Sequence, residues 1–141
     1  MLPDRVLLDL SLERQAIGWS RAIDAVLPGQ GVLVAEDETA GVVGVGSCGR
    51  VHRNAPLSFE GEIYTLYLLS DWHGQGLGRS MLDWLLQRLR ARGLDRILLW
   101  VVEANPTRFF YEAMGAKVIA RRREPFAGVL LDELAYGWSP S

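Results

Sequence analysis

Several features that mark other protein classes are scarce in this chain of 141 residues. Its one cysteine, Cys48, excludes an internal disulfide. No apolar run approaches the roughly 18 residues that a membrane span needs, and Met1–Arg5 lacks the basic start of a signal peptide. The net charge of −2 gives no reason to expect nucleic acid or an anionic membrane as a partner. These absences predict a soluble cytoplasmic protein, and the length predicts a single domain over residues 1–141.

Lysine is equally scarce, and this limits the ways in which the chain could bind a nucleotide. The only lysine is Lys117, so no glycine cluster is followed by the lysine of the P-loop, G-x-x-x-x-G-K-[ST]. Use of ATP or GTP by that route is therefore not expected. A dinucleotide fingerprint, G-x-G-x-x-G, occurs only at Gly44–Gly49, inside a strand pattern with no helix after it. Chance is the better explanation of that match.

What the chain does contain is a glycine-rich turn between a predicted strand and a predicted helix. The run Trp72–Arg79 has three glycines at every second position, after the apolar segment Ile63–Leu69 and before the helical pattern Ser80–Arg92. Bare backbone at a helix N-terminus exposes N–H groups and the positive end of the helix dipole, which bind anions such as phosphate. The glycines alone leave two interpretations open, a phosphate-ligand site or a tight turn without a ligand.

Two segments of the chain resemble the acetyl-CoA-binding core of the GNAT family of N-acetyltransferases. In the first, His73-x-x-Gly76-x-Gly78 stands where the family has [Q/R]-x-x-G-x-[G/A], so the histidine departs from the pattern. The second is Asn105–Ala116, an asparagine followed by a helix that carries Phe-Tyr and closes at glycine. Two motifs in this order, with a strand pattern between them, are more specific than either alone. The resemblance covers roughly residues 31 to 138.

The hydrophobic pattern and the resemblance together predict an α+β fold, a GNAT-like mixed central sheet flanked by helices. The first strand is expected to be short or missing, because apolar residues at helical spacing predict a helix over Ser11–Val26 and leave only Val6–Leu8 for a rudimentary strand. The other predicted elements are strands over 31–36, 41–51, 61–69, 96–102, 117–123 and 129–138 and helices over 80–92 and 107–114.

The resemblance implies that backbone groups hold acetyl-CoA, with no metal ion. It places the pyrophosphate on the N–H groups of residues 75 to 80. Pantetheine would lie beside the end of the strand predicted over 61–69, where a backbone N–H would polarise the acetyl carbonyl. Arg79 and His73 could each contact phosphate or simply be solvated, and Asn105 could bind the cofactor or cap its helix. The implied cofactor-binding residues are Leu68, Leu69, His73, Gly74, Gln75, Gly76, Leu77, Gly78, Arg79, Ser80 and Asn105.

Two residues are implied as catalytic by their positions in the family's pattern. Tyr111 would protonate the departing CoA sulfur, since a phenol with an ordinary pKa near 10 stays protonated at neutral pH. The alternative for Tyr111 is a core tyrosine. Glu62, at the start of the third strand, would take the proton of the amine, and the alternative is an exposed glutamate at a strand end.

The resemblance implies transfer of acetyl from acetyl-CoA to a primary amine by direct attack in a ternary complex. The acceptor could be a small-molecule amine or an amine of a protein or peptide. Two rivals remain, a non-catalytic acyl-CoA-binding module and a scaffold that binds no acetyl-CoA. A homodimer through the closing strands is plausible, because Val129, Leu130, Leu131 and Leu134 would make an apolar edge. Candidates for the acceptor pocket are Trp19, Tyr64, Trp100, Glu103, Phe126 and Tyr136.

Overall fold

The computed structural model describes residues 17–24, 31–51 and 58–140, and a single mixed sheet runs through these residues. Its seven strands lie in the order β1-β2-β3-β4-β5-β7-β6, and every neighbouring pair except β4 and β5 is antiparallel. The predicted α+β class is thus confirmed. The strands are β1 Ile17–Asp24, β2 Gly31–Asp37, β3 Gly41–Arg50, β4 Gly61–Leu68, β5 Ile97–Val102, β6 Lys117–Phe126 and β7 Val129–Trp138; the helices are α1 Leu77–Ala91, α2 Arg108–Ala113 and the 3-10 turn η2 Ser70–Trp72.

The prediction of a helix near the N-terminus is wrong over residues 17–24. This segment is β1, a strand of eight residues whose Ile17 lies opposite Asp37 and whose Asp24 lies opposite Gly31 of β2. The backbone of β2 offers unpaired groups along that edge, and pairing with them outweighs a helical spacing of apolar residues. The rest of the predicted helix and the rudimentary strand Val6–Leu8 lie outside the described residues.

The other predicted elements are confirmed to within three residues, and the shift that bears on the site is at the start of α1. This helix begins at Leu77 rather than Ser80, because Gly76 takes a left-handed conformation, φ 82°, and acts as the N-cap. The helix therefore starts inside the glycine-rich run. None of the helices in residues 17–24, 31–51 and 58–140 is long and apolar enough to cross a bilayer.

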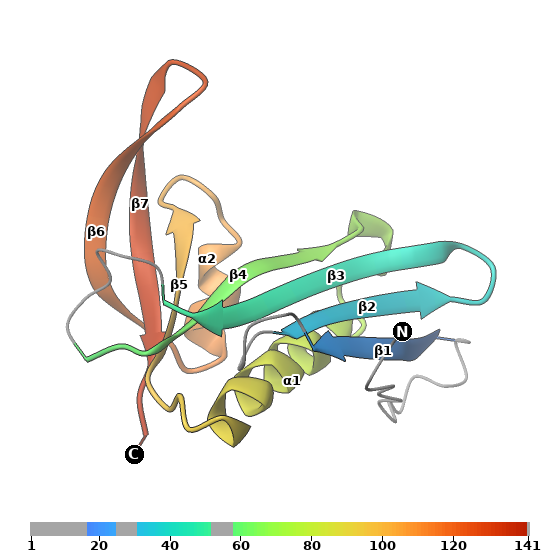
Figure 1. Ribbon diagram of the computed structural model, residues 1–141. Coiled ribbons are helices and arrows are strands. Elements are labelled where there is room, and N and C mark those ends of the chain that lie inside the picture. The colour runs from blue at the N-terminus through green and yellow to red at the C-terminus, as the bar shows by residue number, and fades with distance from the viewer. Residues whose placement is uncertain (1–16, 25–30, 52–57, 141) are drawn as a thin grey trace.

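The sheet opens at its centre, between β4 and β5. These parallel strands pair only at Gly61 with Ile97 and at Glu62 with Leu98. Beyond those pairs they separate, and Figure 1 shows β5–β7 rising steeply away from the corner that they share with β3 and β4. As a result, the edge of β4 beyond Glu62 is not paired with β5, and a space opens between two strands that are neighbours in the sheet.

One face of the sheet is packed by α1, which lies beneath it in Figure 1. The helix turns Met81 and Leu85 inward onto β3, at two positions where the strand has glycine. A Cβ on Gly44 would lie 3.0 Å from Met81 Cε, and one on Gly46 would lie 3.0 Å from Leu85 Cδ1. The formal G-x-G-x-x-G match therefore reflects close packing of a helix against a strand, without any ligand. The remaining buried side chains of α1 are Leu77, Leu82, Leu86 and Leu89.

Cys48 lies on β3 in this core, 1% exposed, as predicted for a small buried hydrophobe. Burial raises the pKa of its thiol to about 12. The thiol is therefore uncharged at neutral pH and is not a nucleophile there.

The apolar residues that were expected to form a dimer edge do not lie on an edge. They belong to β7, which runs between β5 and β6, and Leu134 is 2% exposed in the core. Val129 and Leu130 are exposed at the far end of the hairpin of β6 and β7. The outer strand is β6, whose Arg123 pairs with Asp132 at 2.9 Å. A homodimer remains a prediction, and the residues named for it would meet a partner only at the hairpin tip.

Candidate active site

A cavity of about 870 Å³ lies where β4 and β5 separate. Its walls come from β4, the glycine-rich loop, the start of α1, β5 and α2 with the turn before it. Two motifs that are separate in sequence thus border one space. The predicted site residues that line it are Leu68, His73, Gly74, Gly76, Gly78, Arg79, Asn105 and Tyr111.

The glycine-rich loop depends on backbone conformations that favour glycine. Gly74 has φ 78° and Gly76 has φ 82°, in the left-handed region that other residues rarely adopt. A Cβ at either position would meet nothing within 4 Å, so conformation and not space requires glycine there. Gly78 differs, because it lies inside α1 and its missing side chain would point toward Phe110 and Leu68, at 3.8 and 3.9 Å.

The N-terminus of α1 presents unpaired backbone donors to the cavity. The first intrahelical bond is donated by the Ser80 N–H to the Gly76 carbonyl, at 3.1 Å. The N–H groups of Leu77, Gly78 and Arg79 precede it and have no carbonyl one turn earlier in the helix. These three N–H groups can receive an anion, whereas the predicted Ser80 N–H is already used.

Two other predicted loop residues do not line the cavity. The side chain of Leu77 is fully buried in the core. Gln75 turns its Oε1 inward, where no described residue gives it a hydrogen bond. Any role that either residue has in binding a ligand would therefore fall to its backbone.

His73, which stands where the resembled pattern has Gln or Arg, ties the loop to β4. Its Nε2 lies 2.9 Å from the carbonyl oxygen of Leu68 and donates to it. One nitrogen of the ring is therefore used in a hydrogen bond within the protein, and Nδ1 is the nitrogen that can contact a ligand. Arg79 is exposed at the cavity.

The free edge of β4 offers N–H groups at every second residue. The Leu69 N–H donates to the Val43 carbonyl of β3 at 2.8 Å. Alternation along an antiparallel strand then turns the N–H groups of Leu66 and Leu68 the other way, toward the opening. The N–H of Leu68 thus faces the opening, while the N–H of Leu69 is bonded within the sheet. Leu66 was not predicted, although a period of two from Leu68 would have found it.

Tyr111 lies on α2 at the base of the cavity, with 6% of its side chain exposed. Its ring packs against Phe110, Tyr136 and Trp138, with centroids 5.4, 6.3 and 6.4 Å away. Burial raises the pKa of its hydroxyl above the ordinary value. Among the described residues this hydroxyl has no hydrogen-bond partner, so it is a protonated donor that borders the cavity.

Asn105 shapes the turn that leads into α2. Its Oδ1 accepts hydrogen bonds from the Thr107 N–H at 2.9 Å and from the Thr107 hydroxyl at 2.6 Å. Asn105 thus closes a turn ahead of α2 and does not cap the helix, because the N-cap of α2 is Thr107, which makes no side-chain cap hydrogen bond. Because the oxygen is used in this way, the side-chain NH₂ is the group that can face a ligand.

Glu62 lies at the closed end of the opening, beside the last parallel pair. It is 8% exposed and does not line the cavity, although Ile63 and Tyr64 after it do. The alternative of an exposed strand-end glutamate is therefore wrong. The predicted role as a base would need a water molecule between the carboxylate and the cavity.

Of the candidates for the acceptor pocket, Tyr64 and Trp100 line the cavity. Glu103 instead pairs with Arg121 at 2.9 Å, and Tyr136 donates to Glu112 at 2.5 Å. Phe126 is 69% exposed at the end of β6. The structure describes only the backbone at Trp19.

Comparison of the sequence with known proteins gives a family and several relatives. The model of the "Acetyltransferase (GNAT) family" matches residues 7–116. An uncharacterized N-acetyltransferase, YuaI, of Bacillus subtilis (strain 168) is 37% identical over 109 residues, which are 77% of this chain and 62% of that protein. The mycothiol acetyltransferase of Beutenbergia cavernae is 42% identical over 66 residues, 46% of this chain and 22% of that protein. The chain thus spans less than two thirds of the length of these relatives.

Solved structures share the fold. A ribosomal-protein-alanine N-acetyltransferase from Brucella melitensis has a TM-score of 0.66 at 25% identity, over 79% of this chain and 70% of that one. The yncA protein of Salmonella typhimurium, a putative acetyltransferase solved with acetyl-CoA, has a TM-score of 0.62 at 23% identity, over 79% and 65% of the two chains.

Proposed function

This chain belongs to the GNAT family of acetyltransferases, and from this premise we propose that it transfers the acetyl group of acetyl-CoA to a primary amine by direct attack in a ternary complex. One observation carries the proposal: the opening between β4 and β5 brings a helix N-terminus, a free strand edge and a buried phenol to one cavity. Residues 1–141 would form a single domain of this type.

The residues present fit acetyl-CoA as the co-substrate. The N–H groups of Leu77, Gly78 and Arg79 would bind the pyrophosphate, since a helix N-terminus favours anions. The N–H groups of Leu66 and Leu68 would pair with the amide groups of pantetheine as a further strand would. The absence of a side chain at Gly78 keeps the space between Phe110 and Leu68 open for the cofactor.

Each step of the transfer has a residue suited to it. A backbone N–H of β4 would polarise the thioester carbonyl and stabilise the oxyanion that forms on it. The acetyl-CoA thioester supplies the activated acetyl group. Tyr111 would give its proton to the departing sulfur, and its hydroxyl is protonated at neutral pH because burial raises its pKa.

The proposal is tested first by thermal unfolding with and without millimolar acetyl-CoA, followed by a thiol-release assay with primary amines. A ligand at 100 times its Kd stabilises a protein by about 2.7 kcal/mol, which is several degrees for a domain of this size. A shift without thiol release would favour the non-catalytic acyl-CoA-binding module. Absence of any shift would contradict the proposed function and favour the scaffold.

We also propose that Glu62 takes the proton of the amine through a water molecule, because its buried carboxylate lies two residues before Tyr64 of the cavity wall. Glu62→Gln removes the carboxylate and keeps the size of the side chain, so it should lower kcat about 100-fold, the lower end of general-base effects. The KM for acetyl-CoA should change little. If the variant kept the wild-type kcat, Glu62 would have no role as a base.

A further inference from the structure

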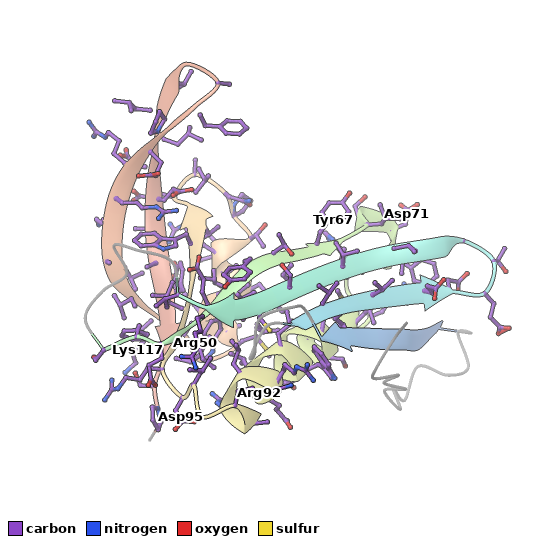
Figure 2. All side chains as sticks on the ribbon, in the orientation of Figure 1. Arg50, Tyr67, Asp71, Arg92, Asp95 and Lys117 are labelled. Atoms are coloured by element: carbon purple, nitrogen blue, oxygen red, sulfur yellow. The ribbon has the colours of Figure 1, made fainter. Side chains whose placement is uncertain are left out.

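The cavity has two ends of different chemistry. Figure 2 shows Tyr67 close to Asp71 at the loop end of β4, while Arg50 lies at the other end of the β3–β4 pair. At that second end the wall is aromatic, with Tyr64 on β4 and Trp100 on β5. The last residue pair of β4 and β5 is Glu62 with Leu98, and Tyr64 and Trp100 each lie two residues further along their strands. The two rings therefore flank the start of the opening. An acceptor would have to meet this aromatic wall if the cofactor filled the loop end.

Tyr64 owes its position to a bulge in β4. Ile63 lies opposite Cys48 and Thr65 lies opposite Ser47, so Tyr64 is the extra residue that the bulge inserts into the register. A bulge of this kind redirects the side chain of the extra residue. The Tyr64 hydroxyl donates to the Arg50 carbonyl at 2.5 Å and holds the ring in place.

The ion pair of Arg122 and Glu133 lies against one face of the Trp100 ring. The guanidinium carbon of Arg122 lies 4.0 Å from the centroid of the Trp100 ring, and Arg122 Nε donates to Glu133 Oε1 at 2.6 Å. One face of the indole thus already carries a cation. Glu133 neutralises this cation, so the pair fixes the ring that lines the cavity and brings no net charge to it.

The charges of the cavity wall also favour an acceptor with an apolar body. Among the described residues that line the cavity there is no carboxylate, and Arg79 at the loop end carries a permanent positive charge. Among these lining residues, a diamine or polyamine would find no counter-ion for its second ammonium group. An apolar or aromatic body would instead gain from burial between the rings of Tyr64 and Trp100.

From this arrangement we infer that the acceptor is a singly charged primary amine carried on an aromatic or bulky apolar group, with Tyr64 and Trp100 as its specificity-determining residues. This inference rests on the proposed function. In the transfer, the amine nitrogen forms the amide bond as the C–S bond of the thioester breaks. The amine loses one proton to the base, and the thiolate gains one from the acid.

The experiment compares two amines, phenethylamine and 1,4-diaminobutane, by thiol release from acetyl-CoA with the full chain. We expect kcat/KM to be at least about 10-fold higher for phenethylamine, the lower range for one buried apolar group. Trp100→Ala should remove most of this preference. Trp100→Leu keeps an apolar side chain at this position and removes only the ring, so it should narrow the preference less than Trp100→Ala does. It also serves if Trp100→Ala does not fold.

Three results would contradict the inference, and they are distinguishable from a failure of the proposed function. Equal rates with the two amines, or a faster diamine, would overturn the substrate class while the acetyltransferase activity stands. An unchanged preference in both variants would overturn the role of Trp100. Absence of thiol release with either amine, in a protein that releases thiol with another primary amine, would overturn the substrate class alone.

Discussion

Gly78→Leu is expected to weaken acetyl-CoA binding at least about 100-fold, or about 2.7 kcal/mol, without destabilising the protein. Gly78 is the second residue of α1, and a Cβ there makes ordinary contacts with Phe110 and Leu68. A leucine would extend from that point into the space through which the cofactor must pass. The backbone would tolerate the change, since leucine is a better helix former than glycine by up to about 1 kcal/mol.

The measurement is thermal unfolding of Gly78→Leu over a range of acetyl-CoA concentrations. Without ligand, the variant should unfold at or above the wild-type temperature, and the ligand-dependent shift should disappear. Gln87→Leu is the matched control, because it adds leucine to an exposed position of the same helix and should keep the full shift. Gly76→Trp would be a poorer variant, because φ 82° at Gly76 would strain any side chain. Loss of the ligand-dependent shift would then not distinguish weaker binding from a destabilised fold. Wild-type affinity in Gly78→Leu would place the cofactor elsewhere.

The cofactor side of this site could be read from the sequence because it depends on local features. Glycines at alternate positions between an apolar strand and an amphipathic helix specify a loop that exposes backbone N–H groups, and the structure has that loop. Asn105 before a short helix specifies a turn in the same way, and its Oδ1 accepts the Thr107 N–H. Features of this kind are set by a few neighbouring residues, so they survive the folding of the whole chain.

Other features depend on pairing between distant strands, and no local pattern reveals them. The helix expected over Ser11–Val26 is a strand at 17–24, because the edge of β2 is there to be paired. The opening between β4 and β5 exists because their pairing stops after two residue pairs. The bulge at Tyr64 is likewise visible only in the register with β3, and it turns that ring toward the cavity.

Tyr111→Phe carries the second large effect, an expected fall of about 100-fold in kcat, the lower range for loss of a general acid. The KM for acetyl-CoA should change little, because the ring and its packing against Tyr136 and Trp138 remain. Burial raises the pKa of Tyr111, so the acid is protonated at neutral pH. Its contribution should persist to high pH and be lost only as the pH rises through that raised pKa. The variant should lack this alkaline limb.

Tyr136→Phe separates the acid role of Tyr111 from the packing of the aromatic cluster. Tyr136 is also buried, with its ring centroid 6.3 Å from that of Tyr111, but it does not line the cavity and its hydroxyl donates to Glu112. Its removal disturbs the same cluster and takes no donor from the cavity, so kcat should stay within a few-fold of wild type. If the two variants lost activity equally, the loss in Tyr111→Phe would come from the disturbed aromatic cluster and not from a missing proton donor. If Tyr111→Phe kept full activity, the proton for the departing thiolate would come from solvent or another group.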